Sequence, residues 1–290
     1  MNKEAERVQL VALTNASIAA KVVPEETMLV AENEPKKQEE VRPLEVVEPK
    51  PKEPPFAQLA SLLYSQDGNE IALNDHKRWP LASLTKIMTA VIALENFSPE
   101  ETITISQTAV DEEGVSGGLN TQEIYSVHDL IAAMMTVSSN DAAMAIATPF
   151  GFEYFVELMN AKANEIGMYN TQFDDPVGLS YLNQSTLSDI RILAQYVLAN
   201  HPQIFSAATQ SQTILVEHST GANRVLGTIN KFAQRPDFLG GKTGYTDEAK
   251  GNLVSLFNIG ASEPLIVIVL GSNDRFADSE ALLTEYSGTR

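Results

Sequence analysis

The chain has 290 residues, with 20 Lys and Arg against 38 Asp and Glu, so its formal net charge is −18. A surface this acidic repels phosphate backbones and anionic lipid headgroups, which argues against nucleic-acid binding through a basic face. The absence of cysteine excludes disulfides, thiolate nucleophiles, zinc–cysteine sites and iron–sulfur clusters.

The first 55 residues differ in composition from the rest of the chain. They hold seven of the 14 prolines and none of the 16 glycines. Such a segment buries too little apolar surface to offset its ordering entropy, so we expect residues 1–55 to form a disordered, semi-extended spacer. Its most apolar stretch, residues 8–23, is interrupted by polar side chains. That stretch could be a weak signal sequence. The alternative is that a membrane tether precedes residue 1, since the stretch itself is too polar to span a membrane.

From residue 56 onward, apolar periodicity and turn signals predict a folded domain that extends to residue 290. The predicted elements, in chain order, are a β-hairpin over 57–73, a helix over 82–96, a strand over 102–105, helices over 127–137, 141–147, 152–166 and 186–200, strands over 213–217, 240–245, 252–259 and 265–270, and a final helix over 274–286. Strands at both ends and helices in the middle indicate an α+β fold, with an antiparallel sheet assembled from the two ends of the domain.

Several chemistry-bearing residues give no pattern that indicates a site. The four histidines are scattered without the spacing of metal ligands, and we expect them in loops or on the surface. The acidic clusters at 111–113 and 174–175 do not fit a calcium loop, and we expect both to be solvated. No phosphate loop or dinucleotide-type glycine turn is present, so we expect neither a metal nor another cofactor.

The first motif with chemical content is Ser83-Leu84-Thr85-Lys86, at the start of the helix predicted over 82–96. Positions three apart share a helix face, so Lys86 lies beside the Ser83 hydroxyl. A serine hydroxyl is a weak nucleophile until a base removes its proton, and lysine is such a base when burial or a second cation lowers its pKa. The apolar residues after Lys86 make a buried setting credible.

Two further motifs follow at 138 and 242. In Ser138-Ser139-Asn140, between two predicted helices, a hydroxyl could relay a proton, and the amide could hold both a substrate carbonyl and the lysine. Either Ser139 or Asn140 could instead cap the following helix. In Lys242-Thr243-Gly244, within a predicted strand, the neighbouring glycines allow a substrate backbone to approach the strand. The lysine and threonine then offer a cation and a hydroxyl to a carboxylate.

With these motifs in this order, the chain resembles the serine-type D-Ala-D-Ala peptidases, the low-molecular-mass penicillin-binding proteins. The resemblance extends over about residues 56–286 and includes the segments that flank the motifs. These segments are 82–90, 125–130 with 138–143, 173–189 and 228–231. It implies the α+β fold shared by β-lactamases and penicillin-binding proteins, an extracytoplasmic bacterial enzyme, and peptidoglycan stem peptides and β-lactams as binding partners.

The resemblance also implies a role for each motif residue. Ser83 would attack the carbonyl between two D-alanines and Lys86 would take its proton. Ser138 would pass a proton to the leaving amine, helped by Lys86 and Lys242. The substrate-binding residues would be Asn140 on the peptide, Lys242 and Thr243 on the terminal carboxylate, and Gly244 and Tyr245 along the strand. The backbone amides of Ser83 and Tyr245 would form the oxyanion hole.

Some features depart from the family pattern and leave alternatives open. Val177 stands where the family often has a histidine. The chain ends after the last predicted helix, without the extra β-rich domain and anchor helix of many members, so we expect any tether to be N-terminal. The resemblance implies a carboxypeptidase that removes the terminal D-alanine through an acyl-enzyme on Ser83, and a D,D-endopeptidase that cuts cross-links is the alternative. A class A β-lactamase is less favoured because residues 173–179 lack the required glutamate, and a non-catalytic peptidoglycan-binding paralogue has no support from the intact motifs.

Overall fold

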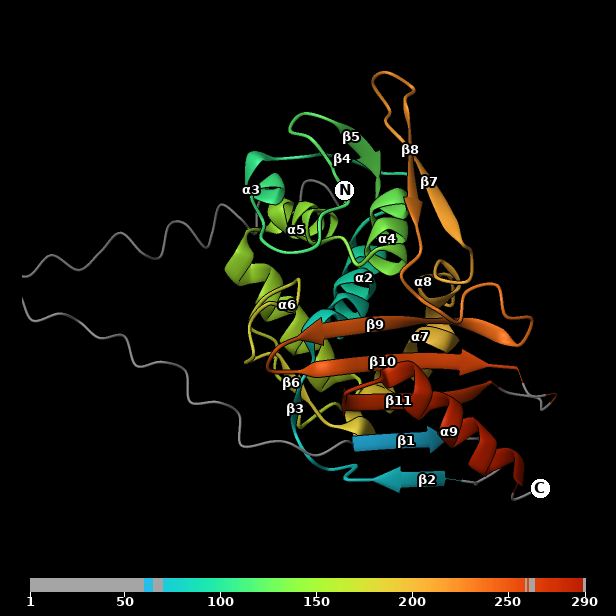
Figure 1. The fold of residues 1–290 in the computed structure, drawn as a ribbon. Helices are drawn as coiled ribbons and strands as arrows, with labels where there is room; N and C mark the ends of the chain where they lie inside the picture. The colour runs from blue at the N-terminus through green and yellow to red at the C-terminus, as the bar shows by residue number, and fades with distance from the viewer. Residues whose placement is uncertain (1–59, 65–69, 259, 261–263, 289–290) are drawn as a thin grey trace, which may run out of the picture. The chain divides into compact units, whose positions relative to one another are not determined.

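The computed structural model describes residues 60–64, 70–258, 260 and 264–288, so the predicted spacer lies outside the described residues. The central feature is a five-stranded antiparallel sheet in the order β2-β1-β11-β10-β9 (Figure 1). Its strands are β1 (Ala60–Tyr64), β2 (Glu70–Leu73), β9 (Phe238–Thr246), β10 (Lys250–Phe257) and β11 (Leu265–Ser272). The predicted antiparallel sheet built from both ends of the domain is thereby confirmed.

The central strands β10 and β11 are buried on both faces, which explains their almost continuous apolar runs. Side chains alternate across a strand, and in β11 they alternate between two cores. Val267 and Val269 join a core with α9 (Arg275–Gly288), which lies across one face of the sheet in Figure 1. Ile266 and Ile268 face the opposite way and join the larger core formed with the helices.

The helical region surrounds a buried central helix, α2 (Thr85–Asn96), whose first nine residues are all buried. The neighbouring long helices are α4 (Val127–Thr136), α5 (Asn140–Ala147), α6 (Phe152–Glu165) and α7 (Leu187–Asn200). Four short helical segments complete the region: η1 (Ala82–Leu84), α3 (Gln107–Val110), η2 (Thr148–Phe150) and α8 (Gln203–Ser206). The predicted helical middle is confirmed, and the ends of the predicted helices lie within three residues of the observed ones, but α3, η2 and α8 were not predicted.

Among the described residues, three small antiparallel pairs lie outside the main sheet. They are β3 (Trp79–Pro80) with β6 (Gln184–Ser185), β4 (Thr102–Thr104) with β5 (Ile124–Ser126), and β7 (Gln212–Val216) with β8 (Asn223–Gly227). The sequence predicted β4 and β7 but missed β3, β5, β6 and β8. Within the described part of the chain, no helix has the length and apolar character needed to span a membrane.

Candidate active site

The serine of the first motif lies on a strained turn at the entrance to α2. Ser83 is partly buried in η1, and Ala82 just before it has a φ of 47°, in the left-handed region that is costly for a residue with a Cβ. The predicted helix therefore begins with a 3₁₀ turn, and the α-helix starts at Thr85. The spacing argument holds across this junction, because the Lys86 Nζ lies 3.1 Å from the Ser83 Oγ.

Lys86 is fully buried and makes three polar contacts. Its Nζ donates to the Asn140 Oδ1 at 2.7 Å and to the Val177 carbonyl at 2.6 Å, besides its contact with Ser83. Burial lowers the pKa of Lys86 to about 7, although nearby carboxylates, chiefly Asp175, work in the opposite direction. At neutral pH a substantial fraction of this amine is therefore uncharged.

The contacts of Lys86 fit a base better than a permanent cation. An uncharged amine keeps two N–H donors, which suffice for Asn140 and Val177, and gains one lone pair. That lone pair is then left for the Ser83 hydroxyl, which becomes the donor of the third hydrogen bond. The arrangement thus positions Lys86 to accept a proton from Ser83.

The second motif forms the junction between α4 and α5. Ser138 follows α4 with a φ of 67°, another strained non-glycine position. Ser139 is the N-cap of α5, where its Oγ accepts a hydrogen bond from the Ala142 amide at 3.1 Å. Asn140 is buried, and besides accepting from Lys86 it donates through Nδ2 to the Glu113 carbonyl at 2.5 Å. The amide thus holds the lysine, as the sequence indicated, and is itself held by a loop.

That loop, residues 113–119, is fastened to the start of α5. Its Val115 carbonyl accepts a hydrogen bond from the Asn140 amide at 2.7 Å. The Asp141 carboxylate accepts from the backbone amides of Gly117 at 2.9 Å and Leu119 at 3.1 Å. The Ser116 hydroxyl also donates to the Asp141 carboxylate, at 2.7 Å. The loop therefore forms one wall beside Asn140, held mainly through its backbone.

The third motif lies on β9, and its lysine is also fully buried. The Lys242 Nζ donates to the Ser138 Oγ at 2.8 Å and to the Thr243 carbonyl at 2.6 Å. Burial, together with the positive charges of Lys86 and Arg275, holds the pKa of Lys242 well below its usual range. Thr243 is buried beside it, whereas Tyr245 is exposed on the strand.

Glycine at 244 permits close contact between β9 and the Ser83 turn. A Cβ at this position would lie 3.0 Å from the Leu81 carbonyl oxygen and 3.2 Å from the Ser83 amide nitrogen. The three motifs therefore meet pairwise: the first and second through Lys86 and Asn140, the second and third through Ser138 and Lys242, and the third and first through Gly244 and Ser83.

The expectation that residues 174–175 form a solvated loop is wrong for Asp175, which is 7% exposed. Its Oδ1 accepts from the amides of Val177, at 2.6 Å, and Gly178. Its Oδ2 accepts from the Ser180 amide at 2.6 Å and the Asn183 Nδ2 at 2.9 Å. Local backbone donors thus offset the cost of burying the carboxylate, which fixes the loop that carries the Val177 carbonyl onto Lys86.

Two other residues at the site were missed by sequence reasoning. Burial, together with the negative charge of Asp175, raises the pKa of Glu112, and Glu112 in turn raises that of Lys86. Arg275, at the start of α9, donates from Nη1 to the Gly244 carbonyl at 2.7 Å. A Pro and a Gly shortly after Asp175 are turn signals that could have suggested its role, but nothing local marks Glu112 or Arg275.

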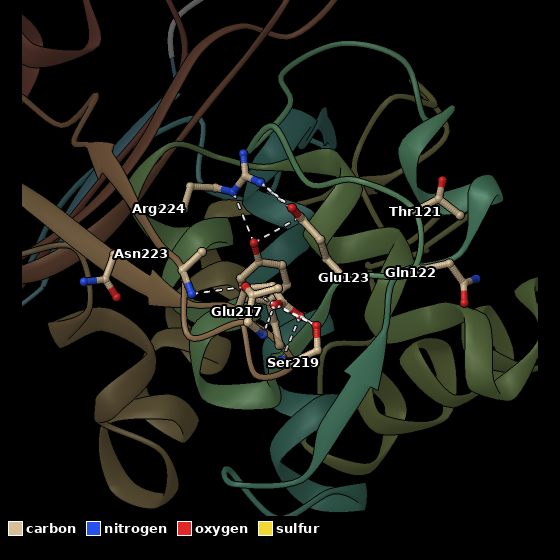
Figure 2. A pocket seen from close by; sticks show the side chains of 10 residues that line it. Thr121, Gln122, Glu123, Glu217, Ser219, Asn223 and Arg224 are labelled. Atoms are coloured by element: carbon tan, nitrogen blue, oxygen red, sulfur yellow. Dashed lines mark hydrogen bonds and ion pairs between the residues drawn. The ribbon is translucent and has the colours of Figure 1, made fainter.

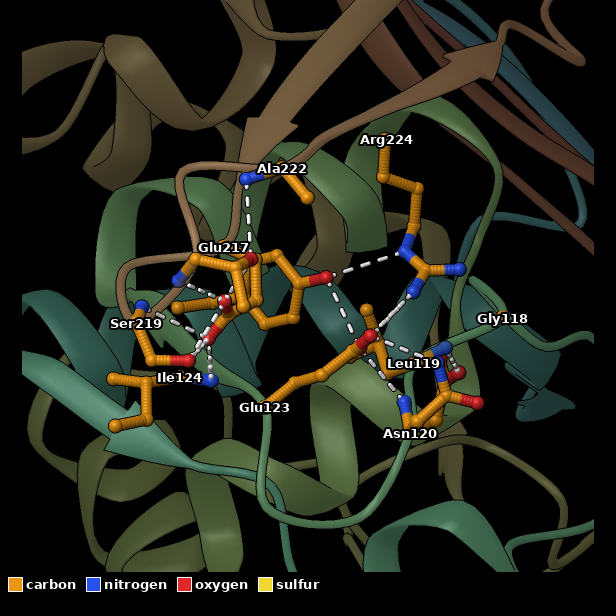
Figure 3. A network of polar contacts seen from close by, with 12 residues as sticks. Gly118, Leu119, Asn120, Glu123, Ile124, Glu217, Ser219, Ala222 and Arg224 are labelled. Atoms are coloured by element: carbon orange, nitrogen blue, oxygen red, sulfur yellow. Dashed lines mark hydrogen bonds and ion pairs between the residues drawn. The ribbon is translucent and has the colours of Figure 1, made fainter.

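A polar cluster lies next to the loop over Asn140. Arg224 on β8 donates to both carboxylate oxygens of Glu123, at 2.8 and 3.0 Å, and to the Tyr125 hydroxyl at 3.2 Å (Figure 2). A Cβ on Gly118, in that loop, would lie 3.1 Å from Arg224. The cluster therefore links the β7–β8 hairpin, β5 and the loop (Figure 3).

Glu217 lies in the same cluster and is 4% exposed. Its carboxylate accepts from the Ile124 amide at 3.0 Å and from the backbone and hydroxyl groups of Ser219 and Thr220 (Figure 3). These bonds hold the pKa of Glu217 far below its usual range. The hollow of about 440 Å³ that these residues line has carboxylates already saturated by the protein's own donors, so the cluster stabilises the wall of the site.

The four histidines differ in their exposure to solvent. His76, His128 and His218 are exposed and His201 is partly buried. Among the described residues, no group of three or more His, Cys, Asp or Glu side chains could hold a metal ion.

Comparison with known proteins identifies the family. The profile of the D-alanyl-D-alanine carboxypeptidase family matches residues 57–274. The chain belongs to this family. It is therefore a serine-type D-alanyl-D-alanine peptidase with the fold of the penicillin-binding proteins, as the resemblance implied.

Individual relatives carry two different names. A D-alanyl-D-alanine endopeptidase of Pseudomonas aeruginosa is 34% identical over 218 residues, which cover 70% of this chain and 68% of the relative. A D-alanyl-D-alanine carboxypeptidase of Mycobacterium tuberculosis, DacB2, is 26% identical over 66% of this chain and 67% of its own. Penicillin-binding protein D2 of Listeria monocytogenes, solved with ampicillin bound, aligns with a TM-score of 0.67 and 29% identity, over 78% of this chain and 95% of that one.

Proposed function

We propose that this enzyme removes the terminal D-alanine from D-Ala-D-Ala ends of peptidoglycan stem peptides through an acyl-enzyme on Ser83. The observation that carries the proposal is the contact between the Ser83 Oγ and the fully buried Lys86, whose pKa lies at about 7. A serine next to an amine that is uncharged in a substantial fraction of molecules at neutral pH is an activated nucleophile.

The proposed reaction has two covalent steps. The Ser83 Oγ forms a bond to the carbonyl carbon between the two D-alanines while Lys86 takes the hydroxyl proton. The carbon–nitrogen bond then breaks as Ser138 gives its proton to the leaving amine and regains one from Lys86 or Lys242, which contacts it at 2.8 Å. Water finally hydrolyses the ester and releases the shortened peptide.

The remaining motif residues bind the substrate in this proposal. Asn140 contacts the peptide through Nδ2, which has a second hydrogen free beyond its bond to Glu113. Lys242 and Thr243 hold the terminal carboxylate, which neutralises part of the buried positive charge beside Ser138. The amides of Ser83 and Tyr245 stabilise the oxyanion, since β9 approaches the Ser83 turn closely at Gly244.

The setting of the enzyme follows from its substrate. Peptidoglycan lies outside the cytoplasmic membrane, so we place the enzyme in the bacterial cell envelope, with β-lactams as acylating inhibitors. Residues 56–290 form the peptidase domain in this proposal, and residues 1–55 are a spacer that extends its reach from an N-terminal tether. The net charge of −18 supports the absence of nucleic-acid partners.

Cleavage of peptide cross-links is the second candidate function, and the endopeptidase name of the Pseudomonas relative favours it. The two activities share all the chemistry and differ in the leaving amine. The test is to incubate the enzyme with an uncrosslinked pentapeptide and with a cross-linked dimer and to identify the products by mass spectrometry. Released D-alanine supports the carboxypeptidase, and conversion of dimer to monomers supports the endopeptidase. Neither product from an enzyme that penicillin acylates would refute both.

A further inference from the structure

A hollow of about 330 Å³ lies beside the end of β9 where Gly244 and Tyr245 stand. It is lined by Tyr245, by Lys231, and by residues 272–276 at the start of α9. The Arg275 guanidinium connects it to the active site, since its Nη1 donates to the Gly244 carbonyl at 2.7 Å. The volume lies at the lower end of the range of small-molecule sites.

Two cations line this hollow without a direct ion pair, although the charge of Asp274 acts on Arg275 and opposes the lowering of its pKa by burial. Among the described residues, no carboxylate forms an ion pair with Lys231 or Arg275. The exposed Lys231 ammonium lies 5.1 Å from the centre of the Phe276 ring, and the Arg275 Nε is buried with no hydrogen-bond partner. Asp274 also lines the hollow, but it accepts hydrogen bonds from the amides of Phe276 and Ala277 at 3.2 Å. Two neighbouring cations that form no ion pair are unexpected in a chain with a net charge of −18.

In the proposed function, Lys242 and Thr243 hold the carboxylate of the leaving residue. That carboxylate would lie next to Gly244, whose carbonyl contacts Arg275 in the lining of the hollow, so the hollow would lie on the leaving-group side of the scissile bond. A leaving D-alanine has only a methyl side chain and would leave the hollow empty. A larger, anionic leaving group would both fill it and neutralise Lys231.

We infer that this hollow receives the leaving half of a cross-linked substrate. That half is an acidic peptide whose side-chain amine is released when the cross-link is cut, and Lys231 contacts a carboxylate of this peptide beyond the one that Lys242 and Thr243 hold. The inference rests on the proposed function and specifies the substrate of the same site. In this reaction the bond from the acyl carbon to that amine breaks in place of the bond to the nitrogen of D-alanine. The amine takes the proton that Ser138 supplies.

The experiment measures initial rates of the full chain on a cross-linked muropeptide dimer and on an uncrosslinked pentapeptide. The ratio compared is the rate on the dimer divided by the rate on the pentapeptide. Lys231→Ala should lower the ratio about three- to fivefold, the effect of one exposed ion pair. Lys231→Arg keeps the positive charge and should keep the ratio close to that of the parent enzyme. Asn273→Trp, at an exposed position of the lining, should lower the ratio about tenfold or more by filling the hollow.

Two controls separate this inference from a general loss of activity. Lys77→Ala removes another lysine that lies over an aromatic ring, that of Trp79, but outside the lining, and should leave the ratio as in the parent enzyme. Raising the salt concentration should lower the ratio of the parent but not that of Lys231→Ala. A parent that is acylated by penicillin yet shows the same ratio as Lys231→Ala and Asn273→Trp, or that does not cut the dimer, overturns the inference and leaves the proposed function standing. A parent that penicillin does not acylate refutes both.

Discussion

Acylation of Ser83 should follow the titration of Lys86. A lysine with its ordinary pKa of 10.5 would be uncharged in about one molecule in three thousand at pH 7, whereas at a pKa of about 7 about half of the molecules carry the free amine. Burial thus increases the available base about a thousandfold at neutral pH. Below pH 7 each further unit reduces the uncharged fraction about tenfold, so the rate should rise with pH and level off above pH 7 to 8.

The assay is the second-order rate of labelling by a fluorescent penicillin between pH 5.5 and 9.5. Glu112→Gln tests the electrostatic origin of the profile, because the Glu112 carboxylate raises the pKa of Lys86. Removing that charge should move the midpoint toward lower pH. Glu113→Gln, an exposed neighbour, is the matched control and should leave the midpoint in place. A profile independent of pH, a midpoint near 10, or an upward shift in Glu112→Gln would show that Lys86 is not the base that activates Ser83.

Three other predictions concern strain and domain organisation. Ser138→Gly removes the hydroxyl that relays the proton, so turnover should fall about a hundredfold or more. Because glycine tolerates the φ of 67°, the melting temperature should stay equal or rise by up to about 3 °C; a large fall would show that the serine is structural. Gly178→Ala would place a Cβ 2.0 Å from the Ala82 carbonyl oxygen, at a position with a φ of 92°. The free energy of unfolding measured in urea should therefore fall by more than about 1 kcal/mol, and penicillin labelling should slow. Parent-like values for both would contradict the packing of this loop on the Ser83 turn. Deleting residues 1–54 should change the melting temperature by less than about 1 °C and leave penicillin acylation as in the full chain; a loss of several degrees would show that the segment packs on the domain.

The parts of the fold that could be predicted from sequence are those with long apolar patterns. Helix α4 and strands β10 and β11 carry such patterns and were predicted with little error. Strand β3 has two residues, and β8 is largely exposed, so neither has enough apolar positions to show a period. These short strands exist because their partners lie beside them in the folded chain, which local sequence does not reveal.

The candidate site divides in the same way. Lys86 could be paired with Ser83 because three residues on a helix fix their proximity. Asp175 could not be placed, since an acidic pair in a loop is usually solvated and its burial depends on four donors that fold around it. Arg275 depends on how α9 meets β9, 31 residues away along the chain from the Gly244 that it contacts.

Intact-mass spectrometry after mixing with penicillin, with peptide mapping of the adduct and Ser83→Ala as the control, shows most directly whether Ser83 is the nucleophile of a peptidase. We expect one penicilloyl group per chain, on Ser83, that persists for minutes or longer. The Asp175 carboxylate is occupied by four donors and the loop offers no glutamate to activate water, so general-base assistance worth about 10² to 10⁴ is missing. Penicillin consumed without an adduct would identify a β-lactamase. No adduct and no consumption would indicate a non-catalytic protein, and an adduct on Ser83→Ala would show that the nucleophile lies elsewhere.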